Sequence, residues 1–292
     1  MSTVNIEFLT PHLLHSVEEA RRFFKLWIKL LPNHLPEKIG TREPLECIFD
    51  TDNLDSVFQI WSWSMNFVGR DSSMKGSVLL GGFPQRFHTS VSMQIAAENL
   101  AQSELIFFFK ELCRHLEVDF ALLEVPSLNY LEFARATRTA GFVTLAKKEF
   151  SIRVSTSNLR QCIPDVYWAM VFGKPYVKLF GHEKLLSAPA HQVKEINPDL
   201  VYLQLSRDFH DTQSKWTEVD AVRQEMKAHL DSDAFFDPTN PDKPYRVPEF
   251  EICGDIPPNP PIPPGSGKLL QVLDVSRKQI HKQPRRGRRR QR

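Results

Sequence analysis

Residues 165–206 read DVYWAMVFGKPYVKLFGHEKLLSAPAHQVKEINPDLVYLQLS, and they predict a strand, a short helix, an extended segment and a second strand. The apolar run over 166–172 is typical of a buried strand. Pro175 suits the start of the helix, because its missing N–H is not needed there. Gly181 is placed to end that helix in a left-handed conformation. The alternation of apolar and polar residues over 201–206 predicts a strand with one buried face.

The segment before residue 100 predicts a helix followed by an antiparallel meander. Ser16 and Glu19 have the spacing of a capping box, and apolar residues recur at helical intervals over 17–31. Three strands joined by short turns are expected over 61–67, 77–80 and 87–95. Trp63 falls on the apolar side of the first of these strands. We expect one aromatic, buried face of the meander and one face lined with Ser, Asn, His and Gln.

The remaining periodic segments complete an α+β body. Ser103 is placed to cap a second helix, and Trp216 and Leu230 share the apolar face of a last one. Further expected elements are a buried strand over 120–125, a helix over 126–141, an outer strand over 150–154 and a joint over 155–163. We therefore predict an α+β body over 1–237, with a mainly antiparallel sheet and packed helices, in halves of about 1–155 and 156–237.

The C-terminal segment differs in composition from this body. Ten prolines between 238 and 264 favour extended backbone and oppose a core, so residues 238–267 are expected to be a linker or a strap laid on the body. Residues 268–292 contain ten Lys or Arg and one Asp, a net charge of +9, and predict a disordered basic tail. Because the whole chain carries +2, residues 1–267 carry −7. This asymmetry suggests basic partners for the body and polyanions for the tail.

Composition points to a cytoplasmic protein. No apolar run approaches the roughly 20 residues that span a bilayer, and Asn5 and Glu7 interrupt the first ten residues, so neither a membrane partner nor a signal segment is expected. The cysteines are far apart and make no C-x-x-C pair, so we expect buried, reduced thiols. They are Cys47, Cys113, Cys162 and Cys253.

No catalytic, cofactor or metal constellation is recognised, so we do not expect an enzyme. The glycines at 265 and 267 precede a lysine, but Leu269 stands where a phosphate loop needs Ser or Thr. Ser187 lies outside any G-x-S-x-G elbow. Five potential metal ligands make no H-E-x-x-H helix face and are expected to be surface residues. They are His182, Glu183, His191, His210 and Asp211.

Two groups of residues are candidates for partner contacts. The first, on the body, is a possible protein interface made of Tyr176, Lys178, His182 and Glu183. The alternative for Tyr176, as for Trp168 and Tyr202, is a place in the core. The second group is a possible nucleic-acid contact in the tail, because clustered cations neutralise phosphates without reading bases; the alternative is a solubilising tail. This second group comprises Arg285, Arg286, Arg288, Arg289, Arg290 and Arg292.

The aromatic segment WAMVFGKPYVKLFGHEKLLSAPAHQVKEINPDLVYLQLS resembles bacterial polymorphic-toxin immunity proteins, in particular immunity protein 52. The resemblance covers roughly residues 4–237 and excludes the tail. It implies a cytoplasmic α+β protein that binds a cognate toxin and blocks it without chemistry. The predicted function is therefore that of a non-enzymatic protein-binding module of immunity type. The alternative is a nucleic-acid-associated accessory protein that binds through its arginine-rich tail.

Overall fold

A computed structural model describes residues 3–251 and 253, with gaps at 46, 83–86, 128, 131–133, 135–136 and 138–150. The chain divides into two units, Met1–Ile256 and Pro257–Arg292, and only the first contains described residues. The arginines of the expected basic tail, and most of the helix expected over 126–141, lie outside the described residues.

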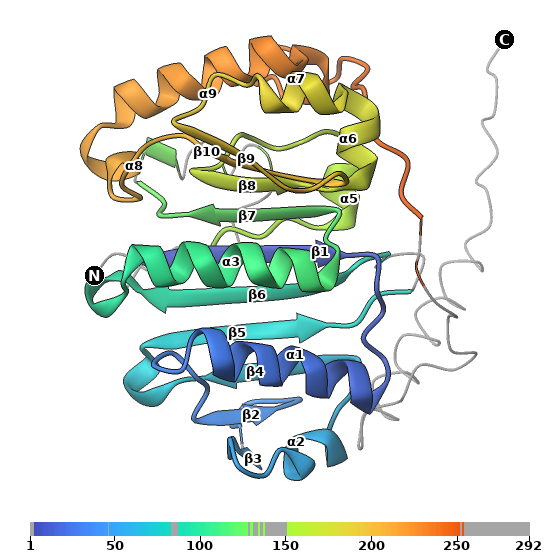
Figure 1. Cartoon of the computed structure of the whole chain (residues 1–292), viewed down its shortest axis with the longest axis vertical. Helices are drawn as coiled ribbons and strands as arrows, with labels where there is room; N and C mark the ends of the chain where they lie inside the picture. The colour runs from blue at the N-terminus through green and yellow to red at the C-terminus, as the bar shows by residue number, and fades with distance from the viewer. Residues whose placement is uncertain are drawn as a thin grey trace, which may run out of the picture. The chain divides into compact units, whose positions relative to one another are not determined.

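The described strands form one sheet in which every pairing is antiparallel (Figure 1). In their order across the sheet they are β3 (Cys47–Ile48), β2 (Lys38–Gly40), β4 (Ser64–Val68), β5 (Met74–Leu79), β6 (Thr89–Ala96), β1 (Thr3–Thr10), β7 (Phe120–Glu124), β8 (Ala169–Phe172), β10 (Leu200–Gln204) and β9 (Gln192–Asn197). The expected α+β class with a mainly antiparallel sheet is confirmed. So is the three-stranded meander, as β4, β5 and β6.

The strand β1 occupies a central place that the sequence analysis missed. It pairs with β6 on one side and with β7 on the other. Its apolar residues Val4, Ile6 and Phe8 alternate with Asn5 and Glu7, which is the pattern of a strand. All five of these side chains are buried. Because β1 bridges β6 and β7, strands from both predicted halves belong to the same sheet.

Helices lie along the sheet, and they include short ones beside the longer helices that were expected from the sequence. They are α1 (Val17–Leu30), α2 (Asp55–Gln59), α3 (Gln102–Leu116), α5 (Thr156–Leu159), α6 (Lys174–Phe180), α7 (His182–Leu186), α8 (Asp211–Ser214) and α9 (Trp216–Leu230), with short 3-10 turns η1 (Arg70–Ser72), η2 (Ala97–Asn99) and η3 (Ser232–Ala234). The capping box of α1 is confirmed, because the Ser16 hydroxyl accepts from Glu19 N–H and the Glu19 carboxylate accepts from Ser16 N–H. Ser103 is not a cap: α3 begins at Gln102, after Ala101, so Ser103 lies in its first turn.

The stretch 165–206 folds as strand, helix and strand, with three differences from the expectation. Gly181 ends α6 at a positive φ of 90°, but its ψ of 135° lies outside the left-handed helical region that was expected, and α7 begins directly after it. Residues 192–197 form a regular edge strand, β9. β10 is buried on both faces, and not on one, because Tyr202 packs on one side of the sheet and Val201 on the other.

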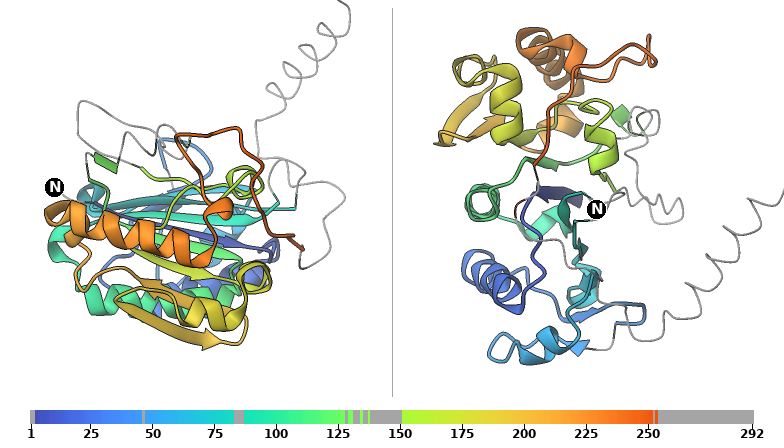
Figure 2. Two further views of the ribbon diagram at one scale, coloured as in Figure 1. Left: turned by 90° about the horizontal axis from the view of Figure 1, so that it is seen from above. Right: turned by 90° about the vertical axis from the view of Figure 1, so that its right-hand side faces the viewer.

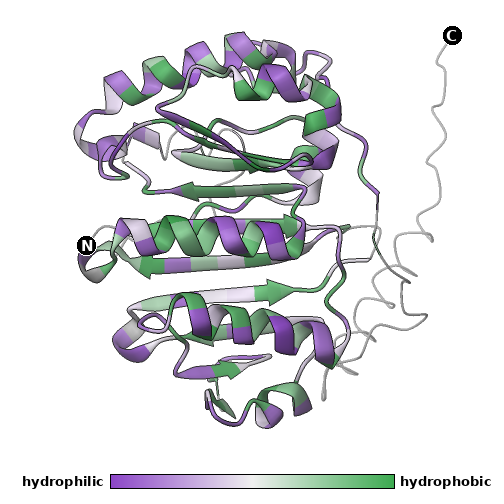
Figure 3. Ribbon diagram, viewed as in Figure 1, coloured by the Kyte–Doolittle hydropathy of each residue, from purple (hydrophilic) through white to green (hydrophobic). Residues whose placement is uncertain are grey.

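Two hydrophobic cores cover opposite faces of the sheet. Alternate residues of β7 divide between them: Leu123 joins the core under α1 and α3, and Leu122 joins the core under α6 and α9. Figure 1 shows α1 and α3 crossing in front of the strands, and Figure 2 shows the sheet from two further sides. The strands in the middle of the sheet are mostly apolar, whereas α1, α3 and α9 carry both hydrophilic and hydrophobic residues (Figure 3). Burial on both faces explains why β7 and β8 are continuous apolar runs.

Two smaller expectations about strands are wrong. Trp63 precedes β4 and is only half-buried, whereas Met65 and Phe67 face the core. Ile152 and Val154 are buried, but the described residues 151–155 form no strand of the sheet. Periodicity identifies the buried side chains here, but it does not locate the ends of elements.

A hydrogen-bonded polar layer lies on the second face of the meander, where Ser, Asn and Gln were expected. The carboxylate of Glu7, 1% exposed, accepts a bond from Ser92 Oγ at 2.6 Å. Arg153 Nη1 donates to Ser92 Oγ at 2.8 Å and to Ser77 Oγ at 3.0 Å. Burial raises the pKa of Glu7 to about 7, although Arg153 and the bond from Ser92 favour its charged form.

Glu7→Gln is expected to remove a pH-dependent loss of stability. The folded protein holds the proton of Glu7 up to about pH 7, whereas the unfolded chain releases it near 4.5. The free energy of unfolding should therefore fall as the pH rises from 4.5 to 7, by roughly 3 kcal/mol at most, and then level off. Urea unfolding of both proteins between pH 4 and 8 measures this, with Glu225→Gln, an exposed change on α9, as control. Parallel curves for the native protein and Glu7→Gln would contradict the assignment.

Candidate functional site

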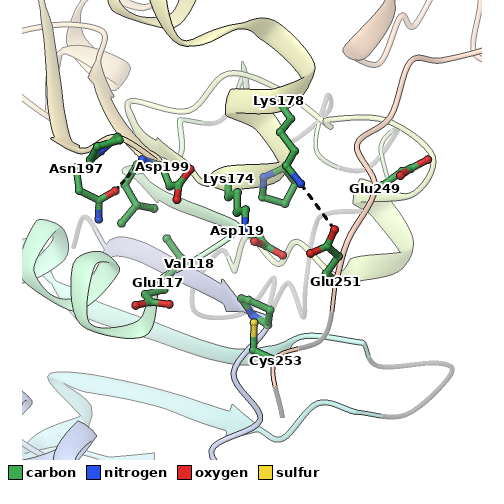
Figure 4. Close-up of a pocket in the computed structure, with 14 residues that line it drawn as sticks. Glu117, Val118, Asp119, Lys174, Lys178, Asn197, Asp199, Glu249, Glu251 and Cys253 are labelled. Carbon is green, nitrogen blue, oxygen red and sulfur yellow. Dashed lines mark hydrogen bonds and ion pairs between the residues drawn. The ribbon is translucent and has the colours of Figure 1, made fainter. Parts of the chain in front are cut away.

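A pocket of about 310 Å³ opens where five segments meet (Figure 4). These segments are the end of β1 at Pro11, the α3–β7 connection at 117–119, the first turns of α6, the β9–β10 turn at 197–200, and residues 249–253. Distant parts of the chain meet here because β1, β7, β8 and β10 are consecutive neighbours in the sheet. The pocket therefore depends on the central strands and not on one loop.

The pocket lining is acidic. Five carboxylates line it, together with two ammonium groups, those of Lys174 and Lys178. The carboxylates belong to Glu117, Asp119, Asp199, Glu249 and Glu251. Two of these carboxylates have a basic partner on the surface: Lys178 Nζ lies 3.7 Å from Glu251 Oε1, and His12 Nε2 lies 3.0 Å from Glu117 Oε2. The excess of negative charge makes the pocket suited to cationic groups.

One wall of the pocket is a strap, which we define as residues 238–251 and 253. Arg246 fixes the strap to the body, with Nη1 2.9 Å from Asp231 Oδ2 and Nη2 2.9 Å from the carbonyl of Leu179. Farther along, Phe250 packs edge-on against Tyr176, with ring centroids 6.2 Å apart. Cys253 N–H donates to the Pro11 carbonyl at 3.1 Å. These contacts place Glu249 and Glu251 beside α6.

Asp119, at the floor of the pocket, is the outermost member of a buried row formed by a hydroxyl, an imidazole and a carboxylate. Thr156 Oγ1 lies 2.9 Å from His88 Nδ1, and His88 Nε2 lies 3.0 Å from Asp119 Oδ2. All three residues are buried, and only Asp119 lines the pocket. Burial raises the pKa of Asp119, although the bond from His88 favours its charged form. Thr156 is therefore not placed to attack a molecule in the pocket.

The thiol of Cys253 lines the same pocket, but it is poorly suited to be a nucleophile. Burial and the nearby carboxylates of Asp119 and Glu117 raise its pKa. A thiol reacts as its thiolate, which needs positive surroundings. Of the other cysteines, Cys113 and Cys162 are buried and Cys47 is half-buried; all four are free thiols. The expectation of buried, reduced thiols thus fails for Cys253, which is exposed.

The four residues predicted to form a protein interface do not lie on one surface in the structure. Tyr176 is completely buried against Phe120 and Phe172, so it belongs to the core, as Trp168 and Tyr202 do, and is not available to a partner. Lys178 lies two residues farther along α6, on the other side of the helix, and lines the pocket. His182 and Glu183 begin α7, where His182 Nε2 lies 2.9 Å from Glu195 Oε2 and Glu183 is exposed. The six tail arginines lie outside the described residues.

The acids of the pocket were not predicted from the sequence. Asp119 stands directly before the apolar strand β7, and a charged residue at such a boundary is a signal that was available. Glu249 and Glu251 gave a weaker signal, because their Pro-rich surroundings indicated only a linker or strap. Their position depends on the anchoring of Arg246, which no local pattern predicts.

The described part of the chain contains neither a metal-binding group of side chains nor a membrane-spanning helix. No group of three or more His, Cys, Asp or Glu residues there is arranged to hold a metal ion. Nor does any helix in that part combine the length and the apolar composition needed to cross a membrane.

Comparisons with known proteins find likenesses among solved structures. No protein-family model matches the chain, and no curated protein matches it. Among solved structures, the chain is similar to the Pseudomonas aeruginosa T6SS protein PA0821, with 12% sequence identity and a TM-score of 0.46, over 77% of this chain and 72% of that chain. The resemblance to immunity protein 52 thus stays a prediction from the sequence.

Proposed function

We propose that this chain is a non-enzymatic binding protein that holds a basic protein partner at the acidic pocket and neutralises it. The observation that carries the proposal is the pocket lining, with five carboxylates against two lysines. The partner class that fits it best is a toxin that grips phosphates, because such a protein must carry positive charge.

The charge of the chain outside the tail supports the same partner class. Residues 1–267 carry a net charge of −7, so the field around them attracts a basic protein before contact. Exposed carboxylates at a contact surface act mainly on the rate of association and on the choice of partner. The resemblance of residues 4–237 to toxin-immunity proteins points in the same direction.

The chemistry of the pocket favours binding over catalysis. Its thiol, Cys253, is disfavoured as a thiolate, and the hydroxyl that contacts His88 belongs to the buried Thr156. The described lining offers carboxylates and lysines suited to ion pairing.

Replacing the two pocket carboxylates of the strap with lysine should abolish neutralisation of the toxin. Because immunity genes usually stand beside the gene of their toxin, the test expresses the product of the neighbouring gene in cells with and without this chain and follows growth. We expect growth arrest that this chain relieves, and we expect Glu249→Lys/Glu251→Lys to lose that relief, with association at least tenfold slower at low salt. The matched control is Glu98→Lys/Glu225→Lys, the same charge change at exposed sites outside the pocket. Relief that survives the strap change would contradict the proposed contact surface.

A second candidate function rests on the composition of residues 268–292. Ten Lys or Arg in 25 residues give this segment the charge density that binds phosphate backbones. No aromatic residue interleaves the arginines over 285–290, so stacking on bases is not indicated. In this alternative the chain is a nucleic-acid-associated accessory protein, and its affinity resides in the tail.

A further inference from the structure

Asp119 differs from the other acids of the pocket in burial. It is 4% exposed, whereas Glu117, Asp199, Glu249 and Glu251 are exposed. Its backbone is fixed on both sides, because its N–H donates to Leu9 O at 2.9 Å and its carbonyl accepts from Gly173 N–H at 2.9 Å. The carboxylate therefore has a set position at the floor, between β1 and the start of α6.

Two buried residues also fix the orientation of this carboxylate. His88 is 1% exposed and holds Asp119 Oδ2 at 3.0 Å through Nε2. An ionised carboxylate can only accept, so Nε2 carries the proton in this bond. The other ring nitrogen lies 2.9 Å from Thr156 Oγ1, and the ring packs edge-on against Phe250, with centroids 4.7 Å apart. His88 and Thr156 thus act as positioning residues for Asp119.

The second carboxylate oxygen of Asp119, Oδ1, has no such partner in the described part of the chain. Among the described residues no hydrogen bond or ion pair reaches Asp119 Oδ1, although the side chain lines the pocket. Lys178 is paired with Glu251, and Lys174 forms no ion pair within the described part of the chain. A buried, oriented carboxylate with one unpaired oxygen is stabilised by a cation that enters the pocket.

Building on the proposed function, we propose that Asp119 is the specificity-determining acid of the pocket, and that it receives one lysine or arginine side chain of the partner. The exposed acids attract the partner, and Asp119 retains it. Because the carboxylate is already oriented, little side-chain entropy is lost when the cation binds. Because it is buried, the contact is only weakly screened by salt.

The two kinds of acid predict different kinetic effects. Losing a charged hydrogen bond to a buried group weakens binding about tenfold or more. For Asp119→Asn this loss should appear in the dissociation rate, whereas Glu249→Lys/Glu251→Lys should mainly slow association. Asparagine is close in shape and still accepts from His88, so the floor keeps its packing.

The kinetic experiment uses the full chain and fluorescein-labelled hexalysine in stopped-flow measurements. We expect at least tenfold faster dissociation for Asp119→Asn, slower association for Glu249→Lys/Glu251→Lys, and little change for Glu98→Lys/Glu225→Lys. Thermal melting verifies the fold of each variant. Dissociation unchanged in Asp119→Asn, with weakened binding by the strap variant, would overturn this inference and leave the proposed pocket intact. If the unaltered chain does not bind hexalysine, the role of Asp119 and the proposed acidic binding pocket are both contradicted.

A second measurement needs no substitution. Carbodiimide joins a carboxylate to a contacting lysine amine, so cross-linking of the unaltered full chain to hexalysine, followed by peptide mapping, identifies the acid that holds the ammonium group. We expect an amide at Asp119. Cross-links at the exposed acids alone, with Asp119 unmodified, would overturn the inference even if Asp119→Asn fails to fold.

Discussion

Arg223→Met is expected to remove about 3–5 kcal/mol from the free energy of unfolding, because it leaves the buried carboxylate of Glu124 without its partner. Both side chains are completely buried, and Arg223 Nη2 lies 2.8 Å from Glu124 Oε2. Arg223 Nε also donates to the carbonyl of Val166 at 2.8 Å. A thioether replaces neither contact, so a charge and a carbonyl lose their partners together.

The surroundings of Arg223 explain why this pair links α9 to the sheet. The guanidinium carbon lies 5.3 Å from the ring centroid of Tyr130 and 5.0 Å from that of Trp216, both within cation–π range. Glu124 Oε2 also accepts from Trp168 N–H at 2.9 Å, just before β8. One carboxylate therefore connects the end of β7, the segment that leads into β8, and α9.

Three comparisons test this explanation of the pair. Burial raises the pKa of Glu124 even beside Arg223, and removing the cation raises it further. The loss in Arg223→Met should therefore be small near pH 4.5 and grow as the pH rises, which urea unfolding measures. Glu124→Gln in the same chain should restore much of the stability, because glutamine keeps a bond to Trp168 without a charge. Arg22→Met, in an exposed pair with Glu18 on α1, should change stability by no more than about 0.5 kcal/mol. A loss that is the same at all pH values would contradict the buried-charge explanation.

The fold was predictable where a buried sheet face requires apolar residues at regular intervals in the sequence. Residues 165–206 carry an apolar run, a Gly-Lys-Pro break and an alternating run, and β8, α6 and β10 follow in that order. β1 had an equally clear alternation, but Asn5 and Glu7 were considered only as residues that interrupt a signal segment. They are buried because the polar layer of Ser92, Gln94 and Arg153 supplies hydrogen bonds, and such partners come from distant residues that a local pattern does not show.

The candidate site was harder to predict for the same reason. Its acids come from separate segments of the chain, and only the order of strands in the sheet brings them together. Lys178 was selected as a surface residue of a short helix and does line the pocket. Tyr176 was selected with it, but it faces the opposite side of α6, toward Phe172. Burial on an amphipathic helix of two turns is decided by tertiary packing, so the two residues could not be separated from sequence alone.

Removal of the tail is expected to abolish any nucleic-acid binding by this chain. Residues 268–292 carry +9 and the remainder carries −7, so phosphate should be attracted to the tail and repelled by the rest. If about five or six tail cations contact duplex phosphates, the slope of log affinity against log salt is near −5, since each contact contributes roughly −0.9. Affinity should then fall about a thousandfold between 50 and 200 mM salt. Base sequence should have little influence, because phosphate contacts carry no sequence information.

Fluorescence anisotropy with DNA and RNA of several sequences measures this slope for the full chain and for a chain ending at Gly267. The matched pair of full-length variants replaces the six arginines from Arg285 to Arg292 with lysine or with glutamine. Lysine keeps the charge and should keep the slope, whereas glutamine should make it shallower and weaken binding. Affinity retained by the chain ending at Gly267 would move the contact to the first 267 residues. If neither the full chain nor any variant binds at low salt, the accessory-protein alternative is excluded, and the acidic pocket remains as the proposed basis of function.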